Sequence, residues 1–100
     1  MTFRLRIAPE AAIQTAQVDA WWREQRPTAS DLFWQELNAA FDHLEAAPFA
    51  SSLYEPVERP NLRRLLLPRT RYWLYFTIEG DQVVVRALWH TARGQGPTLP

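Results

Sequence analysis

Four arginines lie around one predicted turn in the stretch RRLLLPRTRYWLYF, which spans residues 63–76. They are Arg63, Arg64, Arg69 and Arg71, and aromatic residues follow them directly. Each guanidinium is a permanently charged planar fork that suits carboxylates, phosphates or aromatic faces. The stretch therefore indicates a binding surface for a partner that carries such groups. Alternatively, the arginines only blunt an exposed strand edge and keep the turn soluble.

A histidine extends the chemistry that these arginines could do. His90 follows the arginine-rich stretch, and an imidazole can hold or transfer a proton near neutral pH. Paired with an arginine, it could grip and protonate a phosphate ester. The plainer interpretation is an exposed or hydrogen-bonded histidine at a strand end, and His43, beside Asp42 and Glu45, is expected to be solvated. With no second histidine at helical spacing and no cysteine, we expect no metal site and no cofactor.

Length and composition limit the class of protein. The chain has 100 residues, 47% of them hydrophobic, which suits a single domain over residues 1–100 with a flexible tail from about residue 94. The lack of cysteine suits a reducing compartment. No stretch approaches the roughly 18 apolar residues of a membrane span, and the charged N-terminus lacks the apolar run of a signal peptide. We therefore expect a cytoplasmic protein with no membrane partner.

The charge is unevenly distributed although its sum is zero. Residues 1–58 carry four arginines and nine acids, a net charge of −5, whereas residues 59–100 carry seven arginines and two acids, a net charge of +5. The two halves could therefore meet different partners. All eleven basic residues are arginine, which could equally reflect genomic base composition.

The N-terminal quarter is expected to form a strand and a helix. Apolar and polar residues alternate over residues 2–8, which predicts a half-buried strand. Pro9 suits the first turn of a helix, and the Arg26-Pro27 pair ends it, so the helix is predicted over about 9–25. Its apolar face is expected to carry Ile13, Ala16, Ala20 and Trp21.

A second helix and a long loop follow. Thr28 with Asp31 resembles a capping box ahead of an apolar stripe, and Pro48 ends the helix. The connection between the helices is short, so they should form an antiparallel hairpin. Residues 48–61, rich in proline and serine, are predicted to be a surface loop.

Three strands are predicted in the remainder, over residues 62–67, 71–79 and 82–90. Gly80-Asp81 is a two-residue hairpin loop that places Glu79 opposite Gln82 and sets the pairing of the last two strands. One face then holds the apolar pairs Ile78–Val83, Phe76–Val85, Leu74–Ala87 and Tyr72–Trp89. The other face holds Thr77–Val84, Tyr75–Arg86, Trp73–Leu88 and Arg71–His90. The apolar face should pack on the helices, which leaves the arginines and aromatics on the uncovered face.

Three tryptophans on the predicted helices are candidate anchors for a partner. Trp21 and Trp22 are consecutive, about 100° apart around a helix, so a two-helix hairpin on one sheet cannot easily bury both. At least one large apolar side chain, Trp34 included, should lie near the surface, where aromatic anchors often mark a partner site. Alternatively, each covers part of a small irregular core.

The order strand, helical hairpin and three-stranded meander, with LRRLLLPRTRYWLYFTIEGDQVVVRALWHTARG at its end, resembles the RelE/ParE superfamily of bacterial type II toxins. The resemblance covers nearly the whole chain and is most specific over residues 62–93. FWQELNAAFDHLEAAP on the second helix is similar to the family's Phe-x-x-Glu-Leu-x-x-Ala pattern. The resemblance implies an α+β fold, β-α-α-β-β-β, in which the two-helix hairpin packs on one face of an antiparallel sheet.

The resemblance also implies partners. Members of the superfamily are toxins held inactive by a cognate antitoxin, and an acidic antitoxin segment would pair well with the arginines. The RelE branch cleaves mRNA on the ribosome, whereas the ParE branch is described as poisoning DNA gyrase without a known catalytic group. The residues proposed to bind the target or the antitoxin are Arg63, Arg64, Arg69, Arg71, Trp73, Tyr75, Arg86, His90, Arg93, Trp21, Trp22 and Trp34.

The nuclease pattern of the RelE branch is matched only in part. Arg93 occupies the position of an arginine after the fourth strand, but Trp73 stands where that branch has an arginine after the tyrosine, and lysine is absent. The near-neutral isoelectric point of 6.7 gives no net positive field for ribosome binding. We favour a ParE-like binding protein that is not an enzyme. The alternatives are an mRNA endonuclease, with His90, Arg93, Arg71 and Arg86 as catalytic candidates, and a relative that binds an antitoxin but has no activity.

Overall fold

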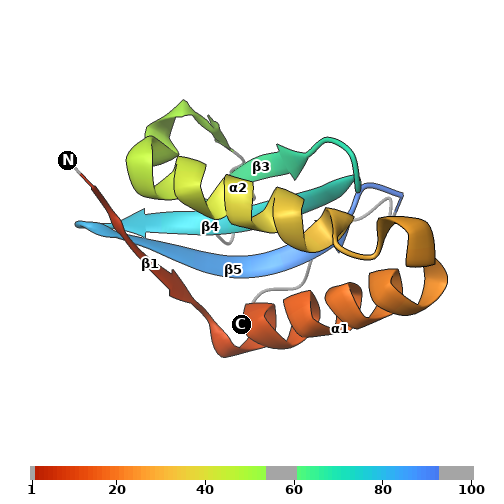
Figure 1. Cartoon of the computed structure of the whole chain (residues 1–100). Coiled ribbons are helices and arrows are strands. Elements are labelled where there is room, and N and C mark those ends of the chain that lie inside the picture. The colour runs from red at the N-terminus through yellow and green to blue at the C-terminus, as the bar shows by residue number, and fades with distance from the viewer. Residues whose placement is uncertain (1, 54–60, 93–100) are drawn as a thin grey trace.

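The computed structural model describes residues 2–53 and 61–92 and confirms the α+β class (Figure 1). The elements are β1 (Arg4–Ile7), α1 (Pro9–Gln25), the 3-10 turn η1 (Pro27–Ala29), α2 (Leu32–Ala46), the 3-10 turn η2 (Pro48–Ala50), β2 (Ser52–Leu53), β3 (Arg63–Leu67), β4 (Tyr72–Glu79) and β5 (Gln82–His90). The bounds predicted for α1 and β5 are confirmed. The tail expected from residue 94 lies outside the described residues.

The five strands form one sheet in the order β1-β5-β4-β3-β2. β3, β4 and β5 pair antiparallel, as predicted, but β1 runs parallel to β5, so the sheet is mixed. The first strand of the chain thus pairs with the last one, β5, at the edge of the meander. β2 is a two-residue edge strand inside the segment predicted to be a loop, where Ser52 and Leu53 pair with Arg64 and Arg63.

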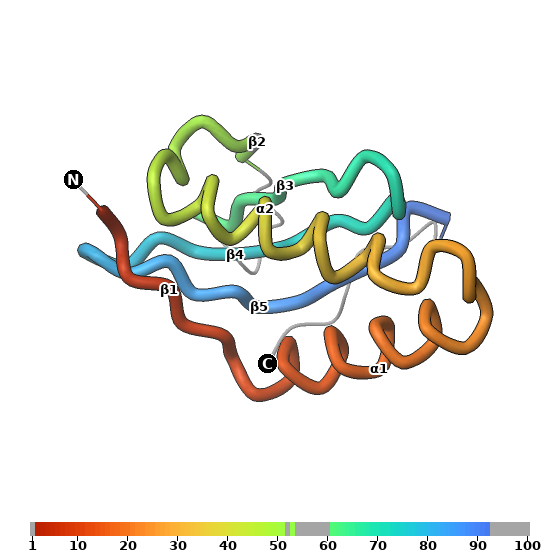
Figure 2. The backbone as a smooth tube through the Cα atoms, in the orientation of Figure 1, coloured from red at the N-terminus to blue at the C-terminus, as the bar shows by residue number. Residues whose placement is uncertain are grey.

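Both helices lie on the same side of the sheet and run antiparallel, as Figures 1 and 2 show. The side chains between them and the sheet form the main core. It consists of Ala11, Phe33, Leu37, Ala40 and Leu44 from the helices and Leu67, Leu74, Phe76, Val83, Val85 and Leu88 from the sheet. The remaining side of the sheet is called the outer face below.

The face of α1 that packs on the core differs from the predicted one. Ala11 and Thr15 are buried, with Val18 and Trp22 packed against the core, whereas Ile13 is 58% exposed. Alanines lie on several sides of this helix, so apolar spacing alone does not identify the buried face. Thr15 can be buried because its hydroxyl donates to the carbonyl oxygen of Ala12 at 2.9 Å.

The predicted capping box is absent from the start of α2. Asp31 is the N-cap, but its φ of −94° and ψ of −1° are helical, and its side chain accepts no hydrogen bond from the first turn. A side-chain cap needs an extended N-cap backbone, and the η1 turn leads into α2 without one. The Asp31 carboxylate instead accepts a hydrogen bond from Arg23 of α1 at 3.1 Å.

A bulge in β5 changes the predicted pairing halfway along the hairpin. Close to the turn the predicted pairs are confirmed, as far as Phe76 opposite Val85. The ladder then skips Arg86, and beyond it the pairs are Tyr75–Ala87, Leu74–Leu88, Trp73–Trp89 and Tyr72–His90. The four predicted pairs that joined Tyr75, Leu74, Trp73 and Tyr72 to β5 are therefore wrong by one residue, and so is Arg71–His90.

The physical reason for the bulge lies in the order of side chains. With strict alternation after Val85, Ala87 would point into the main core and Leu88 would point to the outer face. One extra residue lets Leu88 enter the main core, while Arg86 stays on the outer face. The bulge therefore adds the large side chain of Leu88 to the main core without burying the charge of Arg86.

The free edge of β5 is protected by α1. β1 reaches only Ile7, after which the Ala8 amide donates to the carbonyl oxygen of Val85 at 2.9 Å and Pro9 begins the helix. Further along β5, the Leu88 amide donates to the side-chain oxygen of Gln14 at 2.8 Å. A helix residue thus satisfies a donor that an adjoining strand would otherwise pair.

Deletion of Arg86 tests the bulge. We expect the shortened chain to fold, because Val85 stays in the core and Ala87, Leu88 and Trp89 keep their sides. The loss should be modest, about 1 kcal/mol for the ion pair with Glu79. Urea unfolding measures it.

Deletion of Val84 is the matched control, since it also removes one residue from β5. It would move Arg86 into the core position of Val85, and a buried unpaired charge should cost about 3 kcal/mol or more. Equal stability of the two deletion variants would contradict the bulge.

Candidate partner-binding surface

The outer face gathers arginines from three strands. Arg4 and Arg6 of β1 lie beside Gln82 and Val84 of β5, and Arg64 of β3 lies beside Tyr75 of β4. Arg86 of β5 reaches Thr77 and Glu79 on the same side. Arg4 and Arg6 were missed as candidates. Their alternation with apolar residues indicated one side of a strand, but nothing in the sequence indicated the neighbour of that strand.

The centre of the outer face is a second small core. Tyr75 is 1% exposed and clusters with Leu62 and Ala87, and Trp73 and Trp89 pack against this cluster. Tyr75 was expected as an exposed contact residue, and the structure buries it instead. Trp73 and Trp89, which lie opposite each other in the ladder, are the aromatics left partly exposed.

Arg64 stacks on one of these tryptophans. Its guanidinium carbon lies 3.9 Å from the ring centroid of Trp73, a close cation–π contact. Stacking holds the guanidinium flat against the indole and limits its rotamers. The predicted combination of arginine and aromatic on the uncovered face therefore exists at this position.

Arg86 is engaged by groups of its own sheet. Its Nε donates to the hydroxyl of Thr77 at 3.2 Å and its terminal nitrogen to Glu79, while the Thr77 hydroxyl donates to the same carboxylate at 2.8 Å. The hydrogen bond from Thr77, followed by that from Arg86, lowers the pKa of Glu79. At the same end, Arg4 pairs with Asp81 at 3.3 Å. Both arginines are thus paired with acids of the β4–β5 hairpin, which weakens their electrostatic attraction for a distant anion.

Two more arginines project from the turn between β3 and β4. Arg69 and Arg71 are both exposed, and Arg71 precedes β4 with a φ of 69°. Its carbonyl oxygen accepts a hydrogen bond from the Thr91 amide at 2.9 Å. Arg71 was predicted to face His90 within the ladder, but Tyr72 occupies that position.

His90 lies on the helix side of the sheet. Its ring meets Tyr72 edge-on, with centroids 4.9 Å apart, and its Nδ1 accepts a hydrogen bond from the Ala92 amide at 3.0 Å. It lines a hollow of about 240 Å³ together with Gln14 and Gln17 of α1. The predicted grouping of His90 with Arg86 and Tyr75 on one face is therefore wrong, because the bulge reverses the side on which His90 lies.

One other candidate arginine, Arg63, does not lie on the outer face. Arg63 pairs with Phe76 and so points to the helix side, where its guanidinium lies 5.3 Å from the Phe49 ring and donates to the Ser51 carbonyl oxygen at 2.9 Å. Arg93 lies outside the described residues.

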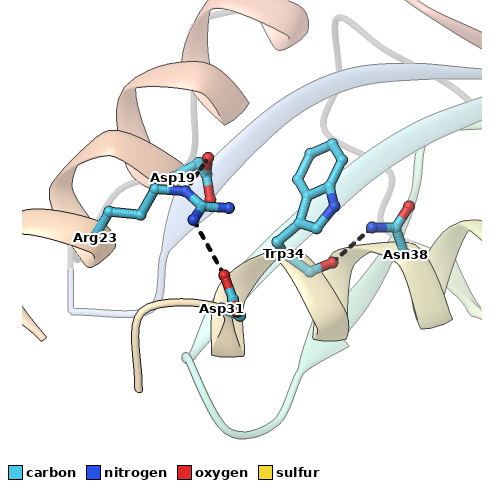
Figure 3. A network of polar contacts seen from close by, with 5 residues as sticks. All are labelled: Asp19, Arg23, Asp31, Trp34 and Asn38. Atoms are coloured by element: carbon cyan, nitrogen blue, oxygen red, sulfur yellow. Dashed lines mark hydrogen bonds and ion pairs between the residues drawn. The ribbon is translucent and has the colours of Figure 1, made fainter. Parts of the chain in front are cut away.

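The tryptophans of the helical hairpin are not all buried, as expected, but Trp21, predicted on the apolar face of α1, is the exposed member of the Trp21–Trp22 pair. Trp22 is partly buried against the core, while Trp21 and Trp34 are 45% and 46% exposed. Arg26 covers the Trp21 ring at 5.4 Å. Figure 3 shows Trp34 beside the bridge in which Arg23 joins Asp19 and Asp31, and this bridge ties α1 to the start of α2. The helix side thus offers two separate indoles to a partner.

Within residues 2–53 and 61–92, no helix is long and apolar enough to cross a membrane. The same residues contain no group of three or more His, Cys, Asp or Glu side chains placed to hold a metal ion.

The Glu79 network makes a pH-dependent prediction. Because its pKa is lower in the folded chain than its ordinary value of 4.5, its stabilisation is complete above that value and is lost as the pH falls through the folded-state pKa. The carboxylate is half-exposed, so the contribution should not exceed about 1 kcal/mol. Carbon NMR titration of the Glu79 carboxyl group measures the shift directly.

Two variants separate the causes of that shift. Thr77→Val and Arg86→Ala should each raise the pKa of Glu79 toward its ordinary value, because each removes a hydrogen bond to the carboxylate. A Glu79 pKa that stays unchanged in both variants would contradict the network.

Comparison with known proteins agrees with this architecture. The chain is similar to a solved chain titled "Chromosomal ParDE TA system from P. aeruginosa", with a TM-score of 0.72 and 17% sequence identity. The alignment covers 89% of this chain and 96% of that one, and at this identity it shows the shared fold. No curated protein sequence matches.

The sequence itself matches one family over most of its length. The match runs over residues 5–94, from β1 to beyond β5, and the family is described as the ParE toxin of the type II toxin-antitoxin system, parDE. The chain therefore belongs to the ParE family of type II toxins.

Proposed function

We propose that this toxin acts by binding DNA gyrase and inhibiting it, and that a cognate antitoxin neutralises it. Family membership supports a toxin, and gyrase is the target that the resemblance to the ParE branch implied. The proposal places the chain in the cytoplasm, where this target lies. It describes a binding protein rather than an enzyme.

The arrangement of the outer face is the observation that supports binding. Arg64 is stacked on Trp73, and Arg86 is joined to Thr77 and Glu79, so these cations are held in fixed positions. Fixed charged and aromatic groups suit recognition of a large partner, because little side-chain freedom is lost on binding.

The position of His90 supports the same choice. General acid–base cleavage of RNA needs a proton donor or acceptor within reach of the group that stabilises the phosphate. His90 lies on the helix side, while Arg86 lies on the outer face, so the sheet separates these two catalytic candidates. The endonuclease alternative had placed His90, Arg71 and Arg86 on one face.

A cognate antitoxin is supported by the similar solved chain, whose title describes a ParDE system. We propose that the antitoxin lays a helical or extended segment across the helical hairpin. Trp21 and Trp34 are large and half-exposed there, as partner anchors commonly are. This leaves the outer face and the turn between β3 and β4 as the proposed contact for the target.

The target is tested with one purified preparation and two assays. We expect inhibition of gyrase supercoiling and no cleavage of mRNA on translating ribosomes. His90→Ala should leave the inhibition unchanged, whereas a double substitution of Arg64 and Trp73 by alanine should weaken it at least about tenfold.

The rival activity predicts the opposite pattern. An mRNA endonuclease would cut transcripts on ribosomes, and His90→Ala would lower that rate by about 10²-fold or more. A chain that neither slows growth when induced nor affects gyrase would contradict the proposal as a whole.

Antitoxin binding is tested on the hairpin. Trp21→Ala with Trp34→Ala should weaken the antitoxin complex by about tenfold or more, measured by titration calorimetry, with little change in thermal stability. Phe49→Ala is the matched control, because Phe49 is an aromatic residue 62% exposed beyond α2. Equal losses from both changes would show that the hairpin is not the docking site.

A further inference from the structure

We propose that Glu36 is a positioning residue that holds the turn between β3 and β4 in the conformation that presents Arg69 and Arg71 to the target. The turn, residues 68–71, is called the arginine turn below. The inference rests on the proposed function for the identity of the target. The contacts between Glu36 and the turn are independent of that identity.

One carboxylate of α2 receives three hydrogen bonds from this turn. Glu36 Oε2 accepts from the Arg69 amide at 2.7 Å, and Oε1 accepts from the Thr70 amide at 2.9 Å and the Thr70 hydroxyl at 2.6 Å. Glu36 and Arg69 are 33 positions apart in the sequence. Bonds to a charged acceptor are stronger than those between neutral groups, so this contact fixes the backbone of the turn on α2.

The turn is also held in a conformation that its sequence does not favour. Arg71 has a φ of 69°, a left-handed value at which glycine or asparagine is the usual residue. Its amide closes the turn onto the Leu67 carbonyl oxygen at 2.8 Å, and its carbonyl oxygen accepts from Thr91 at 2.9 Å. A long cationic side chain at such a position is a local cost that surrounding contacts must offset.

The arrangement buries the anchor and exposes the arginines. Thr70 is 3% exposed, whereas the flanking Arg69 and Arg71 are exposed. Among the described residues, neither guanidinium takes part in a hydrogen bond or an ion pair. Arg69 instead borders an open hollow beside η1 and the start of α2, with Asp31 and Gln35. The turn therefore holds two cations apart from the acids that engage Arg4 and Arg86.

The bonds to the Arg69 and Thr70 amides fix the backbone from which both arginine side chains project. We infer that Glu36 acts through the arginines, and that its effect on activity disappears when they are absent.

The test uses the full chain, with growth arrest after induction and gyrase inhibition as readouts. Glu36→Ala should reduce the inhibition about tenfold or more. In an Arg69→Ala, Arg71→Ala background, the same change should reduce it no further. A residue that only stabilises the fold would weaken both backgrounds equally, and that result would overturn the proposal.

Three milder changes, at Arg71 and Thr70, keep the test valid if Glu36→Ala does not fold. Arg71→Gly relieves the left-handed backbone, so its unfolding midpoint should equal or exceed that of the unchanged chain while its inhibition falls. Thr70→Ser keeps both Glu36 contacts and should retain full activity, whereas Thr70→Val should lose part of it. Full activity in both Arg71→Gly and Thr70→Val would overturn the proposal.

Amide hydrogen exchange separates the failure of this inference from that of the proposed function. Glu36→Gln places an amide nitrogen against one of the donors, so the Arg69 and Thr70 amides should exchange about tenfold faster or more. Unchanged exchange would show that Glu36 does not hold the turn. An unchanged chain that inhibits neither growth nor gyrase would overturn the proposed function and the role in target contact, whereas the exchange result would still decide whether Glu36 holds the turn.

Discussion

The pairing of β4 with β5 is the constraint on which the rest of the structure depends. β5 lies between β1 and β4, so its register decides which side chains meet the helices and which reach the outer face. The bulge at Arg86 divides that register into two halves. Toward the Gly80-Asp81 turn, Val83 and Val85 join the main core, while Val84 between them is buried on the opposite side of the sheet. Beyond the bulge, Leu88 enters the main core, Ala87 and Trp89 join the outer cluster, and His90 turns toward α1.

The helices contribute polar contacts as well as apolar cover. Gln14 of α1 satisfies the Leu88 amide at the free edge of β5, and Glu36 of α2 binds the turn between β3 and β4. Each contact joins segments more than thirty positions apart in the sequence. Because each replaces a strand partner or a turn hydrogen bond, the helical hairpin holds the sheet's open edge and one of its turns in place.

The outer face shows how a chain of zero net charge can still present arginines. At the hairpin end, acids engage Arg4 and Arg86, and near the middle Arg64 stacks on Trp73. Arg69 and Arg71 project separately from the arginine turn, where Arg69 borders the hollow beside η1 and the start of α2. Positive charge is thus concentrated locally rather than spread over the molecule. This distribution agrees with the proposed protein target, because a chain of zero net charge has no overall positive field to attract nucleic acid.

The sequence by itself determined both helices, every strand except β2, the turn between β4 and β5 and the apolar side of β4, because each follows from local periodicity and from the conformational preference of Gly80-Asp81. It also indicated that Trp21 and Trp22 could not both be buried. Only the tertiary structure decided the parallel position of β1, the face of α1, the bulge and the side on which His90 lies. These depend on which large side chains fill a shared core and on contacts such as that of Glu36, whose partners are distant in the sequence and leave no local pattern.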